Sequence, residues 1–224
     1  MTDKTVIVFL IPGKGYTLGF LQSWTKLLKE IYSANDIIEP HFIFFEGSDE
    51  LHTRNAIFQY NSETKTLFDN EWDYDYIVSI DPDVIFEPWQ VFNLIKKMHT
   101  QPDISLVGGT YASKGERTDI LKDFSEEIFL VGENKYFTIE EIKKWGNEIN
   151  NGLLPVMNIG IKFFAAKKGL FERLEYPFFA PIQYQILDEI YVTNPGHSLG
   201  NRIYQIFQRP AVDTFTVVKI ENYL

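Results

Sequence analysis

Two aspartates separated by a proline, Asp81-Pro82-Asp83, form the pattern in this sequence that points most directly to chemistry. Side chains at i and i+2 of an extended segment point to the same side, about 7 Å apart. Two such carboxylates repel each other, and Mg²⁺ or Mn²⁺ relieves the repulsion because hard cations prefer carboxylate oxygens. A metal–diphosphate site is therefore one interpretation of the pattern. The alternative is an ordinary Asp-Pro-Asp turn after a core strand.

The pair follows an apolar run at residues 76–80, which predicts a strand buried on both faces, as in the middle of a parallel sheet. Pro82 has no N–H, so the strand should end there. Ligands in open α/β sheets bind outside the carboxyl ends of the strands. We therefore expect Asp81 and Asp83 at the ligand-binding edge of a sheet.

The start of the chain predicts a strand, a turn and a helix. Apolar residues are continuous over 5–11, glycines occur in 12–16, and helical spacing follows over 20–31, with Thr17 a plausible N-cap. This order is typical of a nucleotide-binding βαβ unit. The glycines fit neither the dinucleotide fingerprint nor the P-loop, so a plain strand-to-helix turn is an equally good interpretation.

A second predicted strand, residues 41–46, ends at Glu46, which could accept a hydrogen bond from a base or ribose. Asp49 could do the same, and solvated loop acids are the alternative for both. A helix predicted over 53–60 carries Arg54. This arginine is a candidate diphosphate contact through its fork of donors, and a surface ion pair is the alternative.

The second half of the chain is more mixed. A strand predicted over 103–109 ends in Gly108-Gly109, and glycine at a strand end often marks the close approach of a ligand or backbone. A later strand is predicted over 156–164. The other expected elements are a helix from Pro88, a polar loop over 113–123, a helix after the capping box at Thr138, a helix over 167–174 and closing strands over 202–207 and 214–220.

Composition limits the classes of function. The 224 residues have a formal net charge of -10, which argues against duplex nucleic acid as a partner, and contain no cysteine for disulfides or zinc. The apolar run at residues 6–11 is too short to span a bilayer and makes a poor signal peptide. We therefore expect a soluble, cytoplasmic protein with no membrane span.

Strands and helices alternate in the first half, which indicates an α/β fold with a mostly parallel sheet, flanking helices and antiparallel additions in the C-terminal half. This order resembles the GT-A class of nucleotide-sugar glycosyltransferases, over most of the chain. The best-matched pieces are residues 6–12, Arg54-Asn55, residues 76–84, residues 107–112, and Asn158-Ile159-Gly160-Ile161 before a helix expected to begin with two lysines.

The resemblance implies one domain over 1–224, with a nucleotide-binding half at 1–112 and an acceptor-binding half at 113–224. It implies transfer of a sugar from a nucleotide-sugar, with a UDP-sugar expected, to a hydroxyl of a glycan or glycoprotein, using Mn²⁺ or Mg²⁺. The Gln-x-x-Arg-Trp motif of processive synthases is absent, which favours addition of a single sugar.

By the same resemblance, Asp81 would face the ribose and metal, and Asp83 would bind the metal directly. His197 matches a late histidine that completes the metal shell in several families, and a surface histidine is its alternative. The other donor-side residues implied are Pro12, Glu46 and Arg54 and, bordering the sugar pocket, Gly108, Gly109 and Asn158.

On the acceptor side, an aromatic, proline-bounded loop at 176–181 is expected to form a stiff apolar wall, and the alternative is that its phenylalanines belong to the core. Asp188 is our candidate general base, should the enzyme invert. The late acidic motif of the class is usually Glu-Asp, whereas this chain has Asp188-Glu189. The identity of the catalytic acid therefore stays open.

Three other functions compete. Haloacid-dehalogenase-like phosphatases also use Asp-x-Asp, with the first aspartate as nucleophile, but on their first strand and with a later Asp-Asp motif that this chain lacks. A sugar nucleotidyltransferase would carry a glycine-rich basic signature after the first strand, which Gly13-Lys14-Gly15 partly provides. A non-catalytic nucleotide-sugar-binding module would bind the donor without turnover.

Overall fold

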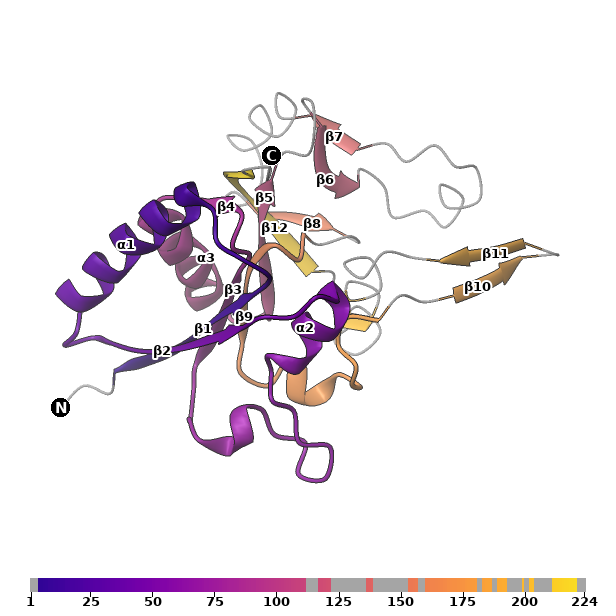
Figure 1. Cartoon of the computed structure of the whole chain (residues 1–224), viewed down its shortest axis with the longest axis horizontal. Coiled ribbons are helices and arrows are strands. Elements are labelled where there is room, and N and C mark those ends of the chain that lie inside the picture. Colours follow the sequence, from indigo (N-terminus) through magenta and orange to yellow (C-terminus); the bar gives the residue numbers. More distant parts are fainter. Residues whose placement is uncertain are drawn as a thin grey trace.

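The computed structural model describes residues 4–111, 117–121, 136–138, 153–156, 160–180, 183–186, 189–192, 199, 202–203 and 211–220. Within these residues a mixed sheet of eight strands forms the centre, in the order β2-β1-β3-β9-β5-β12-β4 with β8 paired to β12 (Figure 1). Its strands are β1 (Thr5–Pro12), β2 (Ile38–Phe45), β3 (Tyr76–Ile80), β4 (Val84–Ile85), β5 (Leu106–Tyr111), β8 (Leu153–Val156), β9 (Phe163–Lys167) and β12 (Ala211–Ile220).

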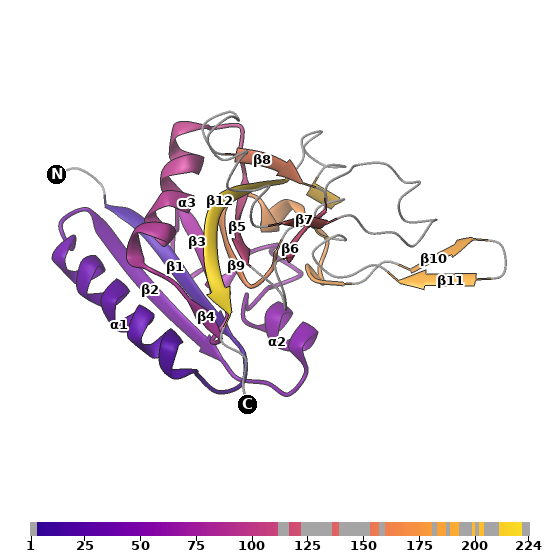
Figure 2. The ribbon, with the colours of Figure 1, turned by 90° about the horizontal axis from the view of Figure 1, so that it is seen from above.

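Helices and two hairpins surround this sheet. The hairpin of β10 and β11 projects away from the sheet in both ribbon views (Figures 1 and 2). The elements in the described part are α1 (Leu18–Ser33), α2 (Glu50–Ala56), α3 (Pro88–Thr100), the 3-10 helices η1 (Phe68–Asn70) and η3 (Phe171–Arg173), the hairpin β6 (Arg117–Leu121) with β7 (Tyr136–Thr138), and the hairpin β10 (Gln183–Ile186) with β11 (Glu189–Val192).

The strand directions confirm the predicted fold class. β1 is parallel to β2 and β3, and β12 is parallel to β5. β9 lies between β3 and β5 and is antiparallel to both, so β3 and β5 run the same way. Only β9, β8 and β4 run against the other strands of the described sheet. The sheet is therefore mostly parallel, with antiparallel strands contributed largely by the C-terminal half.

The core has two layers because β1 is buried on both faces, as a central parallel strand must be. Ile7, Phe9 and Ile11 face one layer, and Val8 and Leu10 face the other. The first layer packs under α1 and α3, which contact each other. Every residue of β3 is buried, as the apolar run predicts, and the strand ends before the proline.

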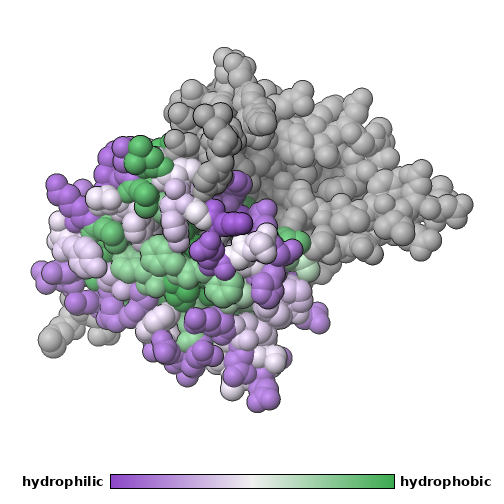
Figure 3. Space-filling model, in the orientation of Figure 1, coloured by the Kyte–Doolittle hydropathy of each residue, from purple (hydrophilic) through white to green (hydrophobic). Residues whose placement is uncertain are grey.

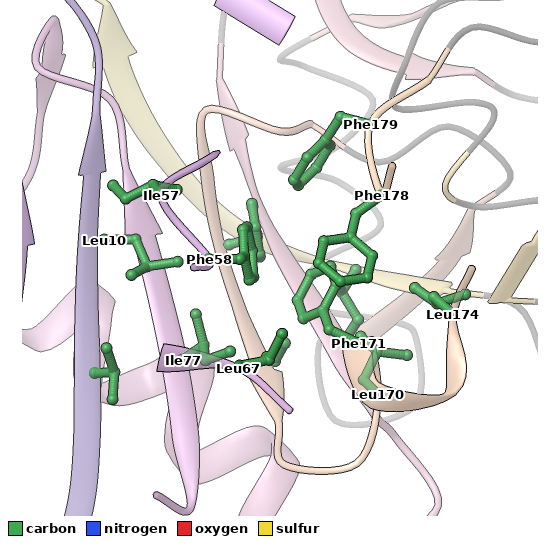
Figure 4. Packing of buried hydrophobic residues seen from close by; sticks show 14 of the residues in the cluster. Leu10, Ile57, Phe58, Leu67, Ile77, Leu170, Phe171, Leu174, Phe178 and Phe179 are labelled. Carbon is green, nitrogen blue, oxygen red and sulfur yellow. The ribbon is translucent and has the colours of Figure 1, made fainter. Parts of the chain in front are cut away.

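The second layer is covered by α2 and by the loops that follow it and β9. In Figure 4, Phe58 from the segment after α2 meets Phe171 and Phe178. The ring centroids of Phe58 and Phe171 lie 4.5 Å apart, and those of Phe58 and Phe178 lie 5.2 Å apart. Phe178 and Phe179 are 0% and 2% exposed, so they belong to the core, and neither forms an exposed acceptor wall.

Several predicted elements of the second half are wrong. No helix follows β9, because Gly169 turns the chain with φ +86° and only the short η3 forms. The loop predicted over 113–123 contains β6, and residues 202–203 are helical rather than extended. The late strand begins at Phe163, not at residue 156. The helix expected after Thr138 lies outside the described residues, and Thr138 itself ends β7.

The described surface is apolar over the edge strand β2 and the start of α1, where green areas appear in Figure 3. Phe44 on β2 is 49% exposed, and Leu18 and Leu21 on α1 are also exposed. In the part of the chain that the structure describes, no helix has the length and apolar character needed to cross a bilayer.

The core position of Phe178 leads to a stability prediction. Phe178→Ala removes a fully buried ring and should lower the free energy of unfolding by roughly 3–5 kcal/mol. Trp89→Ala is the control. Because Trp89 is 60% exposed, this variant should lose far less unfolding free energy. Urea denaturation of both variants checks this, and an equal loss in both would contradict the packing described.

Candidate functional site

A hollow lies at one edge of the sheet, where the turns after β1, β2 and β3 meet the start of β9. Its volume is about 210 Å³. This is smaller than the ~300–1,000 Å³ of sites that enclose a whole small molecule, so it accommodates part of a ligand of nucleotide-sugar size. The residues that line it are Pro12, Gly13, Lys14, Gly47, Ser48, Glu50, Thr53, Arg54, Asp81, Pro82, Asp83 and Lys162.

Asp81 lines the hollow and is only 5% exposed. Its backbone N–H donates to the carbonyl of Lys162 at 2.8 Å. Both carboxylate oxygens accept from Arg54, Oδ1 from Nη1 at 2.8 Å and Oδ2 from Nη2 at 2.5 Å. Such bidentate pairs fix geometry as well as charge, so Asp81 is held rigidly.

Arg54, on α2, is 3% exposed and uses all of its donors. Nε and Nη2 donate to Glu50 at 3.2 and 3.0 Å, and Nη1 also donates to the carbonyl of Ile161 at 3.0 Å. With the two bonds to Asp81, these contacts occupy the five N–H groups of a guanidinium. The alternative of a surface ion pair is therefore wrong, because the arginine is buried.

The pKa values of this pair show opposing effects. Burial raises the pKa of Asp81 to about 6, while Arg54 and Lys162 act in the opposite direction. Burial lowers the pKa of Arg54, but Asp81 and Glu50 raise it more, so the guanidinium stays charged. At neutral pH both partners are therefore ionised, which is how a buried charge is tolerated.

Asp83 has a different environment, although it stands two residues away. Its Oδ2 accepts from the Lys162 ammonium at 2.6 Å. Its Oδ1 is buried and has no hydrogen-bond partner among the described residues. A buried carboxylate oxygen without a partner is costly and calls for an explanation, of which an ion is one.

Asp83 fits a divalent cation better than Asp81, because each oxygen of Asp81 already accepts from Arg54 whereas Oδ1 of Asp83 has no hydrogen-bond partner among the described residues. Among the described residues no group of three His, Cys, Asp or Glu side chains could hold a metal. Mg²⁺, however, is commonly held by one or two carboxylates together with substrate phosphates and water. Asp83 is therefore the described residue suited to hold Mg²⁺ or Mn²⁺, alongside the phosphates of a ligand.

The turns after β1 and β3 are locked together. Gly13 has φ +155°, and a Cβ added there would lie 2.5 Å from Cγ of Pro82, so only glycine fits. Thr17 caps α1, as predicted, by accepting from the N–H of Phe20 at 3.1 Å. Its own backbone N–H donates to the carbonyl of Pro82 at 3.0 Å. The proline between the two aspartates is therefore fixed from two sides.

Other predicted site residues lie at varying distance from this hollow. Pro12 ends β1 and lines it. Glu46 is exposed and is not part of the lining. Asp49 caps α2 by accepting from the N–H of His52 at 2.6 Å, which gives it a structural role. A Cβ on Gly109 would lie 2.2 Å from the Phe163 ring, so that ring is the close approach that the glycine permits.

Some predictions remain untested. Gly108, which pairs with Phe164 in the sheet, and Gly109 stay predicted borders of a sugar pocket. Asn158, Asp188 and His197 lie outside the described residues.

Sequence reasoning missed Lys162 and Glu50. Lys162 reaches the site because β9 runs antiparallel beside β3, which brings its amino end to the carboxyl end of β3. Nothing in the local sequence signals that pairing. Glu50 could have been found from its i, i+4 spacing to Arg54 on a helix.

Neither a protein-family model nor a curated protein sequence matches the chain. Among solved structures it is similar to A197 from STIV, with 14% identity over 98% of this chain and 95% of that chain and a TM-score of 0.49. It is also similar to glucosyl-3-phosphoglycerate synthase from Mycobacterium tuberculosis in complex with Mg²⁺ and uridine diphosphate, with 12% identity, 99% and 73% coverage and a TM-score of 0.46.

A third similar structure is a glycosyltransferase involved in the glycosylation of the major capsid of PBCV-1. It shares 14% identity over 78% of this chain and 68% of that chain, with a TM-score of 0.35. Glycosyltransferases thus stand among the structures that the chain resembles. At these identities and TM-scores the likeness carries no argument about activity, which must come from the residues of the hollow.

The buried ion pair generates a stability prediction. Arg54→Met leaves Asp81 as an unpaired buried charge and should cost about 3–5 kcal/mol of unfolding free energy. Adding Asp81→Asn should restore part of that loss, because the uncompensated charge is gone. Lys168→Met, which breaks the exposed pair with Asp73, is the control and should cost under about 1 kcal/mol. Chemical denaturation measures all three, and equal losses in both single variants would contradict the arrangement.

Proposed function

We propose that the chain is a metal-dependent glycosyltransferase of GT-A type, which moves a single sugar from a UDP-sugar to an acceptor hydroxyl. The observation that carries this proposal is the state of Asp83. Its carboxylate lies at the carboxyl end of a buried parallel strand and lines a hollow, with a buried oxygen that has no hydrogen-bond partner among the described residues. This is the edge at which open α/β sheets bind nucleotides.

The residues of the hollow support binding of a diphosphate. Gly13 and Gly47 bring the backbone of two turns to its lining, and Lys14 and Lys162 contribute cationic side chains. A divalent cation bound at Asp83 supplies Lewis-acid stabilisation of the negative charge that develops on the leaving diphosphate. Asp83 holds that cation, and Arg54 keeps Asp81 in place behind it. The role of Arg54 in this proposal is thus positional.

On the acceptor side, we retain Asp188 as the proposed general base of an inverting reaction. A carboxylate near the acceptor would take the proton of the attacking hydroxyl as the bond to the anomeric carbon forms. His197 stays a proposed additional metal ligand and Asn158 a proposed border of the sugar pocket. We propose a glycan or glycoprotein as acceptor and the cytoplasm as the site of action.

The geometry weighs against a phosphatase. That reaction requires the first aspartate to attack phosphorus, whereas both oxygens of Asp81 are bound to Arg54 and its side chain is buried. The motif also lies at the end of β3, and not on the first strand.

One observation favours a sugar nucleotidyltransferase as second candidate. Lys14, from the glycine-rich turn, lines the hollow. Pyrophosphate-dependent breakdown of a nucleotide-sugar would identify that activity.

The donor site can be tested by calorimetry of UDP binding with Mn²⁺ and with EDTA. We expect binding to require Mn²⁺ and to weaken at least tenfold in Asp83→Asn, which removes the charge but keeps the volume. Asp73→Asn changes an exposed aspartate elsewhere and should bind like the parent. Equal UDP affinity in EDTA would reject metal dependence. A panel of nucleotide-sugars with Mn²⁺, scored by UDP release, then identifies the donor.

Asp188→Ala tests the acceptor side. Without the base, sugar transfer to the acceptor should fall at least 100-fold, since general-base catalysis contributes about 10²–10⁴-fold. UDP binding should be unchanged, because the residue does not contact the diphosphate in this proposal. A variant that transfers sugar at the parent rate would remove Asp188 from the mechanism.

A further inference from the structure

Arg54 and Lys162, the cationic side chains that bind the aspartate pair, differ in how many N–H donors are already engaged. Arg54 has every N–H donor engaged, by Asp81, Glu50 and the carbonyl of Ile161. An ammonium has three donors, and among the described residues the only hydrogen-bond partner of the Lys162 ammonium is Asp83, at 2.6 Å. Within the described residues, a ligand phosphate therefore finds free donors on Lys162 and none on Arg54.

The backbone of Lys162 is held by hydrogen bonds, whereas its side chain is partly exposed in the hollow. Its carbonyl accepts from the N–H of Asp81 at 2.8 Å, and the preceding carbonyl, of Ile161, accepts from Arg54 at 3.0 Å. Its side chain is 30% exposed and lines the hollow. The backbone therefore holds the lysine in place, while its flexible four-carbon stem lets the ammonium change partners inside the hollow.

The net charge of the hollow explains why a change of partner by Lys162 would favour diphosphate binding. Its lining has three basic and three acidic side chains, so its formal charge is zero. A neutral lining attracts a diphosphate weakly. A divalent cation on Asp83 would make the lining positive, and it would compete with Lys162 for the same carboxylate. The displaced ammonium would then be available to the incoming anion.

We propose that Lys162 is the diphosphate-binding side chain of this site, held by Asp83 in the protein alone and released to the phosphates when a divalent cation takes that carboxylate. The inference rests on the proposed function, because it assumes that the hollow binds a metal and a nucleoside diphosphate. It replaces Arg54, which the sequence offered as a candidate for this contact, with a residue that the sequence did not single out.

Two binding measurements test this on the full chain. The first follows Mn²⁺ binding without nucleotide by electron paramagnetic resonance, and the second follows UDP binding at saturating Mn²⁺ by calorimetry. Lys162→Gln keeps a hydrogen-bonding side chain but removes the charge. We expect it to bind Mn²⁺ about tenfold more tightly and UDP about tenfold more weakly, the change that one charge-assisted bond is worth.

Two further variants make the result specific. Lys162→Arg keeps the charge and should retain most of the UDP affinity. Lys168→Met removes the charge of an exposed lysine paired with Asp73 and should leave both affinities within about twofold of the parent. Thermal unfolding of each variant shows that it is folded, and Lys162→Met replaces Lys162→Gln if the latter is not.

Each outcome is decisive. Parent-like UDP affinity in Lys162→Gln would overturn the assignment of the diphosphate contact. Weaker UDP binding without tighter Mn²⁺ binding would overturn the exchange of partners. If the parent protein itself binds no UDP in Mn²⁺, the proposed function fails and this inference fails with it. Failure confined to the Lys162 variants leaves the proposed function standing.

Discussion

The buried ion pair between Arg54 and Asp81 is the interaction on which the candidate site depends. Burying two charges is costly unless their hydrogen bonds are satisfied, and here all of the arginine donors are used. The pair joins α2, the end of β3 and the segment before β9. The adjacent Asn55 joins α2 to the loop that closes the core, because it accepts from the N–H of Phe179 at 2.9 Å. Two consecutive polar residues thus connect one helix to the end of β3 and to the loop that contains Phe179.

This arrangement gives the two aspartates of the Asp81-Pro82-Asp83 motif different roles. Both oxygens of Asp81 accept from the arginine, which ties this residue into the scaffold. One oxygen of Asp83 accepts from a partly exposed lysine, and the other has no hydrogen-bond partner in the part of the chain that the structure describes. The proline between them is fixed by Gly13 and Thr17, so the backbone holds both aspartates in set positions. A rigid first carboxylate and an available second one suit a site that must hold a cation in one place.

Much of the first half of the fold could be predicted, because its signals are local. The unbroken apolar runs of β1 and β3, the cap at Thr17 and the proline that starts α3 each act within a few residues. The site was harder to predict from the sequence, because its contacts join residues that are far apart along the chain. Arg54 meets Asp81 across 27 positions, and Lys162 meets Asp83 across 79. The elements after β9 were missed because Gly169, in the left-handed region, ends any helical continuation that the apolar spacing suggests.

The central claim is that Asp83 binds the metal while Arg54 and Asp81 remain paired. The most direct test is a crystal structure with UDP and Mn²⁺, in which anomalous scattering locates the manganese. The account predicts the metal within about 2.0–2.3 Å of a carboxylate oxygen of Asp83 and of the diphosphate, with the Arg54–Asp81 pair intact. Manganese bound away from Asp83, or UDP bound outside the hollow, would contradict it.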